Sequence, residues 1–368
     1  MKKILLSLFT GASVVSAVLM VLVGYSDRLN PVSYPMLSWL GMTLPVFIVI
    51  NLIMLFLWIL IKWRRIWIPI VAFIICYGPI RTYIPLHSHG TPPEGCIKVM
   101  SYNVCGYANK TFTAQQCTDS IVDFLRREQP DIACFQEDQN AGQDAYGRMK
   151  AIFAYNDTVH IKCEGESELF NTMGIHTRFP ILKKERIAYK STSNGSAAFF
   201  LCIDGDTVVV VNNHLESFHL SEDDRQGYKD VLKGNMGRDS AQAETKHLVK
   251  KVIEANVKRA PQADAVHEYI QQQLAKGHPV IVCGDFNDTP ISYARRTVAK
   301  GLTDCYVESG SGLGISFNQG GFYFRIDQIM CSSHFIPYNC EVISTIDASD
   351  HYPIVCWMEM SHSTCEGK

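Results

Sequence analysis

Acidic, amide and imidazole side chains stand at the ends of short apolar runs throughout the C-terminal three quarters of the chain. Strand ends converge at one rim of a sheet, so side chains that are distant in sequence could meet in one cleft. Hard cations such as Mg²⁺ take oxygen ligands, and imidazoles and carboxylates carry out acid–base chemistry. Taken singly, each residue is more simply a turn former or a cap. The set comprises Asn103, Glu137, His214, Asp285, Asn287, Asp327, Asp350 and His351.

The apolar runs that precede these residues have the length and composition of strands. Residues 97–104 and 279–283 each predict a buried strand, and residues 114–128 carry apolar positions at helical spacing. The runs AAFFLCI and TVVVVNNHL flank a turn at 204–206, which predicts a hairpin. Strands that alternate with helices but also form hairpins predict mixed sheets packed face to face, with helices outside.

The segment 217–276 is the one long stretch without a clear strand. Residues 222–276 predict charged helices that are broken near Gly234–Gly237 and at Pro261. The segment is either an insertion that shapes the substrate site or a set of plain outer helices. Its basic residues between 246 and 259 are more simply a solvated helix face than a stripe that binds nucleic acid.

The first 86 residues are almost continuously apolar and contain three stretches, 4–23, 37–61 and 66–86, of about the length that spans a bilayer. The first stretch also has the pattern of a cleaved signal peptide. A polar, Pro/Gly-rich linker follows. We therefore predict a membrane region of about three transmembrane helices at 1–86, a linker at 87–95 and a catalytic domain at 96–368.

Charge predicts how this region is oriented. Lys62, Arg64 and Arg65 form the densest basic loop, which should be cytoplasmic. One further crossing places residues 87–368 outside the cytoplasm. The expectation is an integral protein of the inner (cytoplasmic) membrane, held by residues 4–86, with its catalytic domain on the extracytoplasmic (periplasmic) side.

The soluble part is acidic. Seven of the 34 Lys and Arg residues and one of the 36 Asp and Glu residues precede residue 87, which leaves 27 and 35 and a net charge of −8. Proteins that grip nucleic acid nonspecifically are usually basic, because they must neutralise phosphates. The acidic balance disfavours a nucleic-acid substrate without excluding one, and it fits a site that concentrates metal cations.

Thirteen cysteines form no CxxC pair and show no zinc-ligand spacing. Several stand in apolar runs and are read as small buried hydrophobic residues. Outside the cytoplasm some of the others could form disulfides. The first group is Cys134, Cys202, Cys283 and Cys356, and the second is Cys96, Cys163, Cys331, Cys340 and Cys365.

Seven short motifs occur in the order that is typical of one enzyme superfamily. They are SYNV, FQE, GIHTRFPI, NNHLES, GDFND, RIDQI and SDHYPI, and together they resemble the endonuclease/exonuclease/phosphatase superfamily over residues 96–360. This resemblance implies an α+β fold of the deoxyribonuclease-I type, a four-layer α/β/β/α sandwich of two mixed sheets, here preceded by transmembrane helices. His176 departs from the family pattern and is interpreted as a surface residue.

The resemblance also implies a metal region. It assigns Asn103, Glu137 and Asp350 to a divalent cation, Mg²⁺ or Mn²⁺, with Glu137 as the best candidate ligand. No other cofactor is implied.

The remaining residues would act on a phosphoester. By resemblance, Asp285 orients or deprotonates the attacking water, and Asn287 donates to a phosphoryl oxygen. His351 contacts the scissile phosphate, and Asp327 holds its ring in one tautomer. His214 protonates the leaving oxygen or binds phosphate.

The expected function is therefore that of a metal-dependent hydrolase acting on a phosphodiester or a phosphomonoester by in-line attack of water. A nucleic acid, a phospholipid or sphingolipid head group and a small phosphate ester remain alternative substrates, so the enzyme could be a nuclease or a lipid phosphodiesterase. A catalytically inactive, membrane-tethered binding protein is the non-enzymatic alternative, and it predicts a broken metal site. No protein partner is implied.

Overall fold

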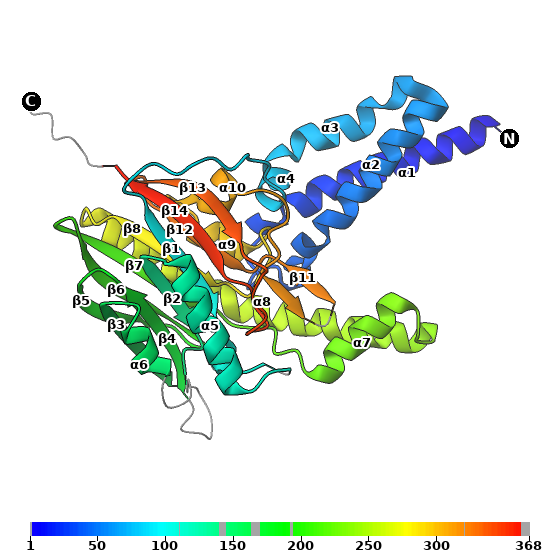
Figure 1. The fold of residues 1–368 in the computed structure, drawn as a ribbon. Helices are drawn as coiled ribbons and strands as arrows, with labels where there is room; N and C mark the ends of the chain where they lie inside the picture. Colours follow the sequence, from blue (N-terminus) through cyan, green and yellow to red (C-terminus); the bar gives the residue numbers. More distant parts are fainter. Residues whose placement is uncertain are drawn as a thin grey trace, which may run out of the picture.

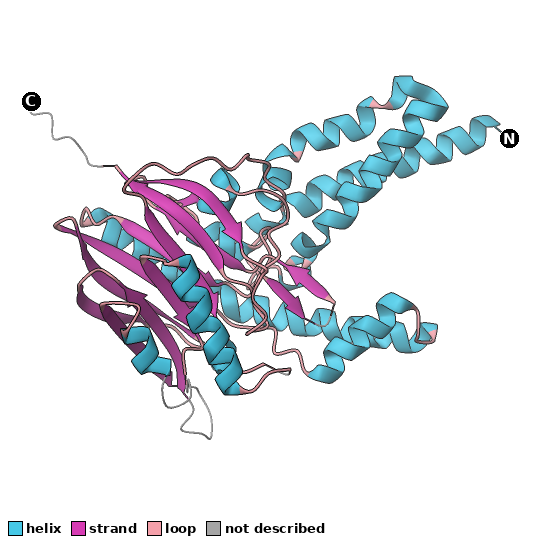
Figure 2. Ribbon diagram, in the orientation of Figure 1, coloured by secondary structure: helices cyan, strands magenta, loops and turns pink. Residues whose placement is uncertain are grey.

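Two mixed β-sheets pack face to face and carry helices on their outer surfaces (Figures 1 and 2). The computed structural model describes residues 2–109, 111–139, 145–162, 170–191, 194–319 and 321–361. The first sheet has the order β13 (Phe335–Val342), β14 (Ile354–Met360), β1 (Ile97–Asn103), β2 (Ile132–Gln136), β4 (Phe170–Thr177) and β3 (Tyr155–Lys162). The second has the order β5 (Ile181–Ile187), β6 (Gly195–Ile203), β7 (Asp206–His214), β8 (Val280–Asp285), β12 (Asp327–Cys331) and β9 (Thr303–Asp304).

One parallel pair in each sheet makes both sheets mixed: β1 with β2, and β7 with β8. A separate two-stranded hairpin joins β10 (Phe317–Gln319) to β11 (Phe322–Phe324). The helices that cover or flank the sheets are α5 (Ala114–Glu128), α6 (Ala145–Lys150), α7 (Glu222–Lys233), α8 (Arg238–Ala275), α9 (Tyr293–Val298) and α10 (Cys305–Ser309), with a 3-10 turn η5 at Cys105–Tyr107.

Alternation of side chains along the strands produces the layers. In β1, Val99 lies in the core between the sheets, and Met100 lies in a second core that includes side chains of α5 and α6. In β8, Cys283 lies between the sheets, and Val282 packs with side chains of α8 and α9. Because successive residues of a strand point to opposite faces, each sheet buries both of its faces. The predicted four-layer α+β sandwich is confirmed.

The segment 217–276 folds into two helices that differ in their packing. α7 ends at Gly234, which has a left-handed φ of 69°, so the predicted break near Gly234–Gly237 is confirmed. The predicted break at Pro261 is wrong, because α8 continues through it. Ala263 and Val266, just after the proline, are buried against the second sheet, and this packing offsets the lost backbone hydrogen bond. α8 is thus an outer helix, whereas α7 projects beyond the sheets (Figure 1).

The cysteines that the structure describes are free thiols, and most of them are buried. Cys134, Cys283 and Cys356 are buried as predicted, and Cys202 is partly exposed. Cys331 and Cys340 are also buried in the core between the sheets. Cys163 and Cys365 lie outside the described residues.

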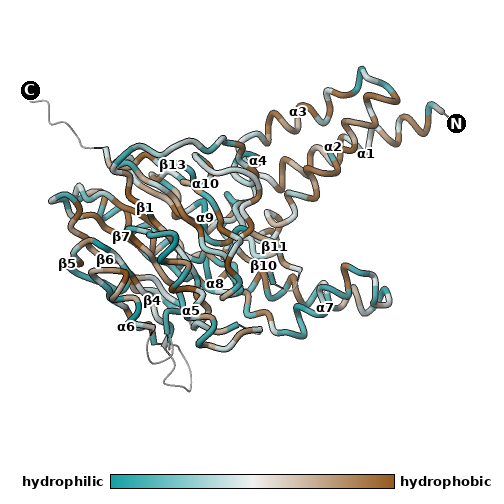
Figure 3. Tube along the Cα trace, in the orientation of Figure 1, coloured by the Kyte–Doolittle hydropathy of each residue, from teal (hydrophilic) through white to brown (hydrophobic). Residues whose placement is uncertain are grey.

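The N-terminal region forms a bundle of apolar helices that leaves the sandwich on one side (Figures 1 and 3). Two candidate membrane spans, Lys3–Arg28 and Pro35–Arg65, are long and apolar enough to cross a bilayer. The third predicted stretch is not one continuous helix but two helices of nine and seven residues. The elements are α1 (Lys2–Gly24), α2 (Leu44–Lys62), α3 (Trp67–Ile75) and α4 (Tyr77–Tyr83), with 3-10 turns η1 (Ser26–Arg28), η2 (Pro35–Leu37), η3 (Leu40–Thr43) and η4 (Trp63–Arg65).

Polar contacts join α1 to α2 in the middle of the bundle. Asn51 donates through Nδ2 to Ser16 Oγ at 3.0 Å, and the Trp58 indole donates to Ser13 Oγ at 3.0 Å. Many apolar side chains of both helices face outward, for example Leu5 at 71% and Phe56 at 61% exposed. Helices that pair through small and polar residues and expose apolar ones suit a lipid environment.

The bundle is docked on the sandwich at two places. Between α1 and α2, Asn30 Nδ2 donates to the Tyr293 hydroxyl at 3.1 Å, and Gly41 lies so close to Ile291 that an added Cβ would be 1.9 Å from its carbonyl oxygen. After α4, the buried guanidinium of Arg325 donates to the Tyr83 carbonyl at 3.4 Å. These contacts fix the position of the sandwich at one end of the helical bundle.

Gly284, the second-to-last residue of β8, is required by the close pairing of β7 and β8. Its φ is +134°, and an added Cβ would lie 2.0 Å from the Asn213 carbonyl oxygen. We predict that Gly284→Ala lowers the free energy of unfolding by about 3 kcal/mol or more, measured by thermal unfolding of the detergent-solubilised chain. Gly90→Ala, which meets no atom within 4 Å, is the control. Equal stability of the two variants would contradict this prediction.

Candidate active site

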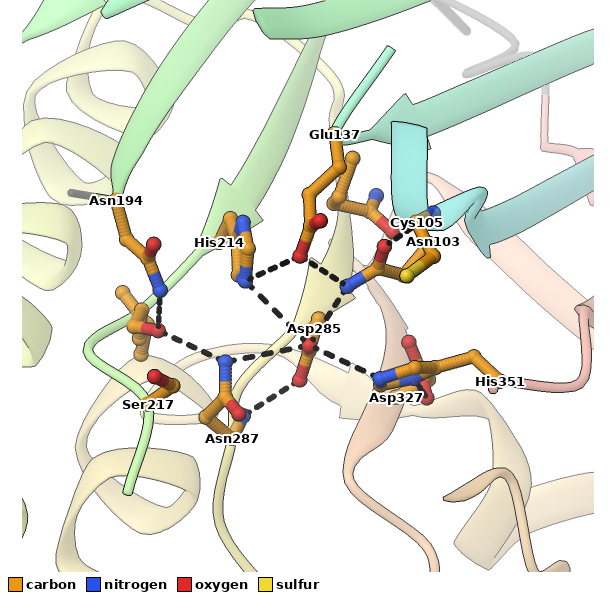
Figure 4. A network of polar contacts seen from close by, with 12 residues as sticks. Asn103, Cys105, Glu137, Asn194, His214, Ser217, Asp285, Asn287, Asp327 and His351 are labelled. Atoms are coloured by element: carbon orange, nitrogen blue, oxygen red, sulfur yellow. Dashed lines mark hydrogen bonds and ion pairs between the residues drawn. The ribbon is translucent and has the colours of Figure 1, made fainter. Parts of the chain in front are cut away.

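The carboxylate of Asp285 is the centre of a cluster of polar side chains (Figure 4). Only 1% of this residue is exposed. Its Oδ2 accepts hydrogen bonds from Asn103 Nδ2 at 3.1 Å and from Asn287 Nδ2 at 3.2 Å. The Nε2 atoms of His214 and His351 each lie 3.6 Å from the same oxygen. Four residues from four separate parts of the chain therefore meet at one atom.

Strand register brings these side chains together. In the second sheet, Asp285 is paired with His214 on β7 and with Asp327 on β12, so the three residues form one row. In the first sheet, Asn103 at the end of β1 is paired with Gln136 at the end of β2. The two rows end at the same rim, and the predicted convergence of strand ends is what the structure shows.

Two of the polar residues adopt a left-handed backbone within two residues of the end of a strand. Glu137 has a φ of 55° and Asn287 a φ of 51°. Such conformations are uncommon for residues other than glycine, and they concentrate at functional sites. At Asn287 the turn is held by its backbone N–H, which donates to Asp285 Oδ1 at 2.7 Å, and by its Nδ2, which donates to the Leu215 carbonyl at 3.0 Å.

The two imidazoles of the cluster are in opposite electrostatic environments. Burial opposes protonation of His351, but the carboxylates of Asp327 and Asp285 outweigh it and raise the pKa of His351 to about 10. Its Nδ1 is 2.9 Å from Asp327 Oδ2. For His214, burial outweighs the attraction of Asp285 and lowers the pKa. The Asn171 amide donates to Nδ1 of His214 at 3.0 Å, which leaves Nε2 as the N–H nitrogen.

The predicted metal region lies in the same cleft. Glu137 Oε1 accepts from Asn103 Nδ2 at 3.3 Å, and Asp350 also lines the cleft. The Asn103 amide oxygen accepts from the Cys105 backbone N–H at 3.0 Å. The tightest group of potential ligand atoms is a different one, Asp285, Asp327 and His351, whose atoms lie within 4.8 Å of one another.

The donor set fits a hard divalent cation. Burial raises the pKa of Glu137 and of Asp285, and a bound cation would favour the carboxylate form of both. Asp327 Oδ1 is buried and has no hydrogen-bond partner among the described residues. Carboxylate oxygens are ligands that Mg²⁺ and Mn²⁺ prefer, and those of Glu137, Asp285 and Asp350 line this cleft. The Asn103 amide faces Glu137 and Asp285 with its nitrogen, so ligation through its oxygen would require the amide to turn over.

The cleft has a volume of about 420 Å³ and one apolar wall. The polar cluster forms its floor. The wall comes from the segment after β7 and from the β10–β11 hairpin, and it consists of Phe218, Leu220, Phe317, Phe322, Phe324 and Ile326. Sequence reasoning missed this wall, and it missed Asn171, Asn194 and Arg225, which also line the cleft. Asn171 and Asn194 lie at the starts of β4 and β6, outside the motifs that marked the other residues, and Arg225 lies on α7, which only the tertiary fold brings to the cleft.

His176 is not a surface residue, so that interpretation was wrong. It is 0% exposed, its Nδ1 is 2.7 Å from Asn156 Oδ1, and its Nε2 is 3.2 Å from Asp138 Oδ2. Its ring also contacts Phe135 and Phe153. β4 pairs with a strand on both edges, and α6 covers this part of the sheet. The imidazole of His176 is therefore shielded from water and bonds to buried polar side chains instead.

The basic residues between 246 and 259 are largely paired with acids, as the reading of a solvated helix face predicts. Lys250 is 3.7 Å from Glu254, and Lys258 is 3.6 Å from Glu216. Arg259 differs because it is fully buried. Its guanidinium lies against the ring of Phe218, a residue of the cleft lining. These residues are absent from the cleft lining, in which Arg225 is the one Lys or Arg among the described residues.

A family model for the endonuclease/exonuclease/phosphatase family matches residues 100–351. This match covers more than half of the chain, and the protein belongs to this family. Residues 3–83 match a second model, described as a domain of unknown function. Comparison with curated proteins gave no match. Members of the family are phosphoesterases or nucleases and generally use divalent metals.

Solved structures with the same fold include the human nocturnin catalytic domain with bound sulfate, at 15% identity and a TM-score of 0.53, covering 74% of this chain and 97% of nocturnin's. A family protein from Leptotrichia buccalis has 14% identity and a TM-score of 0.52, with 72% and 100% covered. One from Bacteroides vulgatus has 16% identity and a TM-score of 0.50, with 73% and 100% covered. These similarities confirm the fold.

Arg259 and Asp288 form a buried ion pair at 2.7 Å directly behind the cleft wall. We predict that Arg259→Met destabilises the protein by about 3–5 kcal/mol, because it leaves a buried carboxylate unpaired. Arg259→Met combined with Asp288→Leu should recover much of that loss in chemical unfolding. Lys250→Met, on the exposed face of the same helix, should cost less than about 1 kcal/mol. A double variant no more stable than Arg259→Met would contradict the pairing argument.

Proposed function

We propose that the protein is a divalent-metal-dependent phosphoesterase that hydrolyses a phosphodiester or a phosphomonoester by in-line attack of water. The observation that carries this proposal is that seven sequence-predicted residues, Asp285 among them, line one cleft, while the eighth, Asp327, holds His351 from behind. The completeness of this set argues against a catalytically inactive binding protein. We keep the division into a membrane region at 1–86, a linker at 87–95 and a catalytic domain at 96–368.

In this proposal Asp285 is the group that orients the attacking water and accepts its proton. Its carboxylate is buried, and the amides of Asn103 and Asn287 hold it in one orientation. A base must be positioned within hydrogen-bond reach of the water, and a fixed carboxylate at the floor of the cleft meets that requirement. The family resemblance gives Asn287 the role of donating to a phosphoryl oxygen. Because both N–H groups of its amide already donate, to Leu215 and Asp285, substrate must replace one of these contacts.

The two histidines have different roles because one is charged and the other is neutral. His351, held protonated between two carboxylates, places a positive charge where negative charge develops on the phosphoryl group. Asp327 fixes its ring through Nδ1. His214 is kept neutral by burial, and its Nε2–H is available to donate to the leaving oxygen. A cation held by Asn103, Glu137 and Asp350 would neutralise charge on the phosphoester.

The cleft favours a compact phosphoester or a lipid head group over a long nucleic acid. A strand that is gripped along its backbone needs a row of Lys and Arg, and among the described residues Arg225 is the one such side chain that lines the cleft. The soluble part also carries a net charge of −8. Docking of the sandwich beside the apolar helices raises the effective concentration of a membrane-resident substrate.

The distribution of charge on the helical bundle supports a catalytic domain outside the cytoplasm. The basic turn after α2 and the start of α1 lie at the end of the bundle that is remote from the sandwich (Figure 1). Arg65 in this turn donates to the Leu6 carbonyl at 3.3 Å and also bonds Thr10, so the two basic ends are in contact. Basic residues flanking membrane helices are enriched on the cytoplasmic side, and this supports a sandwich on the periplasmic side of the inner membrane.

We predict that Glu137→Gln lowers metal-stimulated turnover of an aryl phosphate ester by about 100-fold or more, because it removes a charged oxygen ligand but preserves shape. Turnover is measured with the full chain in detergent, with Mg²⁺ or Mn²⁺ and after chelation. Glu341→Gln, at a partly exposed acid on β13 that does not line the cleft, is the matched control and should retain full turnover. Metal-stimulated activity that survives in Glu137→Gln would remove Glu137 from the metal region.

For the topology, protease added to intact cells after permeabilisation of the outer envelope should digest residues 87–368, because they lie beyond the inner membrane. The fragments are followed with an antibody against this part of the chain, and a cytoplasmic protein serves as the protected control. Full protection of residues 87–368 until the inner membrane is lysed would place the domain in the cytoplasm.

A further inference from the structure

Arg225, on the first turns of α7, is the one Lys or Arg side chain among the described residues that lines the cleft. Its guanidinium lies 5.7 Å from the centre of the Phe317 ring. No carboxylate of the described residues forms an ion pair with it, although four carboxylates line or underlie the same cleft. A cation that is left unpaired in so acidic a cleft is available to a ligand.

α7 is held in place by contacts that do not involve Arg225. Asp224 closes a capping box with Ser221, and its Oδ1 is 2.8 Å from Nε2 of His247. The Lys251 ammonium also pairs with Asp224, so the nearest buried acid of the helix is already committed. One turn further on, Tyr228 stacks on Phe322 of the hairpin, with centroids 4.2 Å apart and planes at 17°. Arg225 is therefore presented on a braced helix and not on a mobile loop.

Phe317 connects Arg225 to the reacting centre. Its backbone forms a bridge with His351, and its ring meets the His351 imidazole edge-on at 5.0 Å. Arg225 thus contacts one face of a ring that also contacts the group proposed to bind the scissile phosphate. One aromatic ring, that of Phe317, lies between Arg225 and His351. This spacing of the two cationic groups suits a substrate that carries a second polar group a few bonds away from the phosphorus that is attacked.

We propose that Arg225 and Phe317 form a second anion subsite, which binds a phosphate or carboxylate of the substrate other than the phosphoryl group that reacts. The planar guanidinium lies over the Phe317 ring, and its paired N–H donors match the geometry of a phosphate or carboxylate in a bidentate contact. This inference rests on the proposed function and narrows it to substrates that carry two anionic groups. The apolar wall beside the subsite would contact the part of the substrate that joins them.

The first test compares inhibitors with one and with two anionic groups. Methylphosphonate carries one, and 3-phosphonopropionate and 1,3-propylenediphosphonate carry two. With the full chain in detergent and saturating Mg²⁺, the two-anion compounds should inhibit aryl phosphate hydrolysis at about tenfold lower concentration than methylphosphonate, the scale of one charge-assisted contact. In Arg225→Gln this ratio should fall to about one, and in Arg225→Lys it should be intermediate.

Lys233→Gln, at the exposed end of the same helix, removes the same charge without approaching the cleft and should keep the wild-type ratio. A ratio that Arg225→Gln leaves unchanged, or that Lys233→Gln lowers equally, overturns the subsite. Calorimetric titration of the inhibitors follows binding without turnover. If the wild type hydrolyses no aryl phosphate but still binds two-anion compounds through Arg225, the proposed function fails and the subsite stands.

A second set of substrates distinguishes the source of the second anion. Phosphatidylserine vesicles are compared with phosphatidylcholine vesicles, and a dinucleotide with a 5′-phosphate is compared with the same dinucleotide without it. If the enzyme prefers phosphatidylserine and this preference depends on Arg225, the second anion belongs to a lipid head group. If it prefers the dinucleotide with the 5′-phosphate and this preference depends on Arg225, the second anion belongs to a nucleotide. The absence of an Arg225-dependent preference in both pairs, with no effect on the inhibitors, overturns the inference.

Discussion

A single buried carboxylate, that of Asp285, sets the requirements that the rest of the sandwich meets. A carboxylate with 1% exposure is costly unless hydrogen-bond donors and positive charge surround it. Here two amides donate to it and two imidazoles face it, and they come from β1, β7, the turn after β8 and the loop before β14. Both sheets must therefore keep their register at one rim, since a slip of one residue would turn these side chains to the opposite face.

The same arrangement separates the protonation states of two chemically identical side chains. His351 lies between Asp285 and Asp327, and these two carboxylates raise its pKa, whereas burial lowers the pKa of His214, which faces Asp285 without a second carboxylate at its Nδ1. Pairs of titratable groups whose environments push their pKa values apart are a mark of acid–base division of labour. The division here follows from register, because Asp285 stands in one row between His214 and Asp327.

The fold could be predicted from the sequence, and so could the polar residues that line the floor of the cleft, because both depend on local patterns. Apolar runs of strand length and the residues at their ends are visible without coordinates, and so is the motif order that indicated the family. Pro261 and His176 were misjudged, since the packing of α8 on the sheet and the partners Asn156 and Asp138 are long-range effects. The apolar wall and Arg225 were not visible for the same reason: a hairpin and a helix almost a hundred residues apart build them together.

The docking of the helical bundle adds a constraint that a flexible tether would not impose. Arg325 stands between Phe324 and Ile326 of the apolar wall, only two residues from Asp327, and its buried guanidinium also binds carbonyl groups at the end of α4. On the other side, Ile291 follows Asp285 by six residues and touches Gly41 between α1 and α2. The cleft is consequently held at a fixed height and orientation beside the apolar helices. A fixed approach favours substrates that reach the cleft from one side, so under the proposed function the bundle would contribute to selection of the substrate as well as to anchoring.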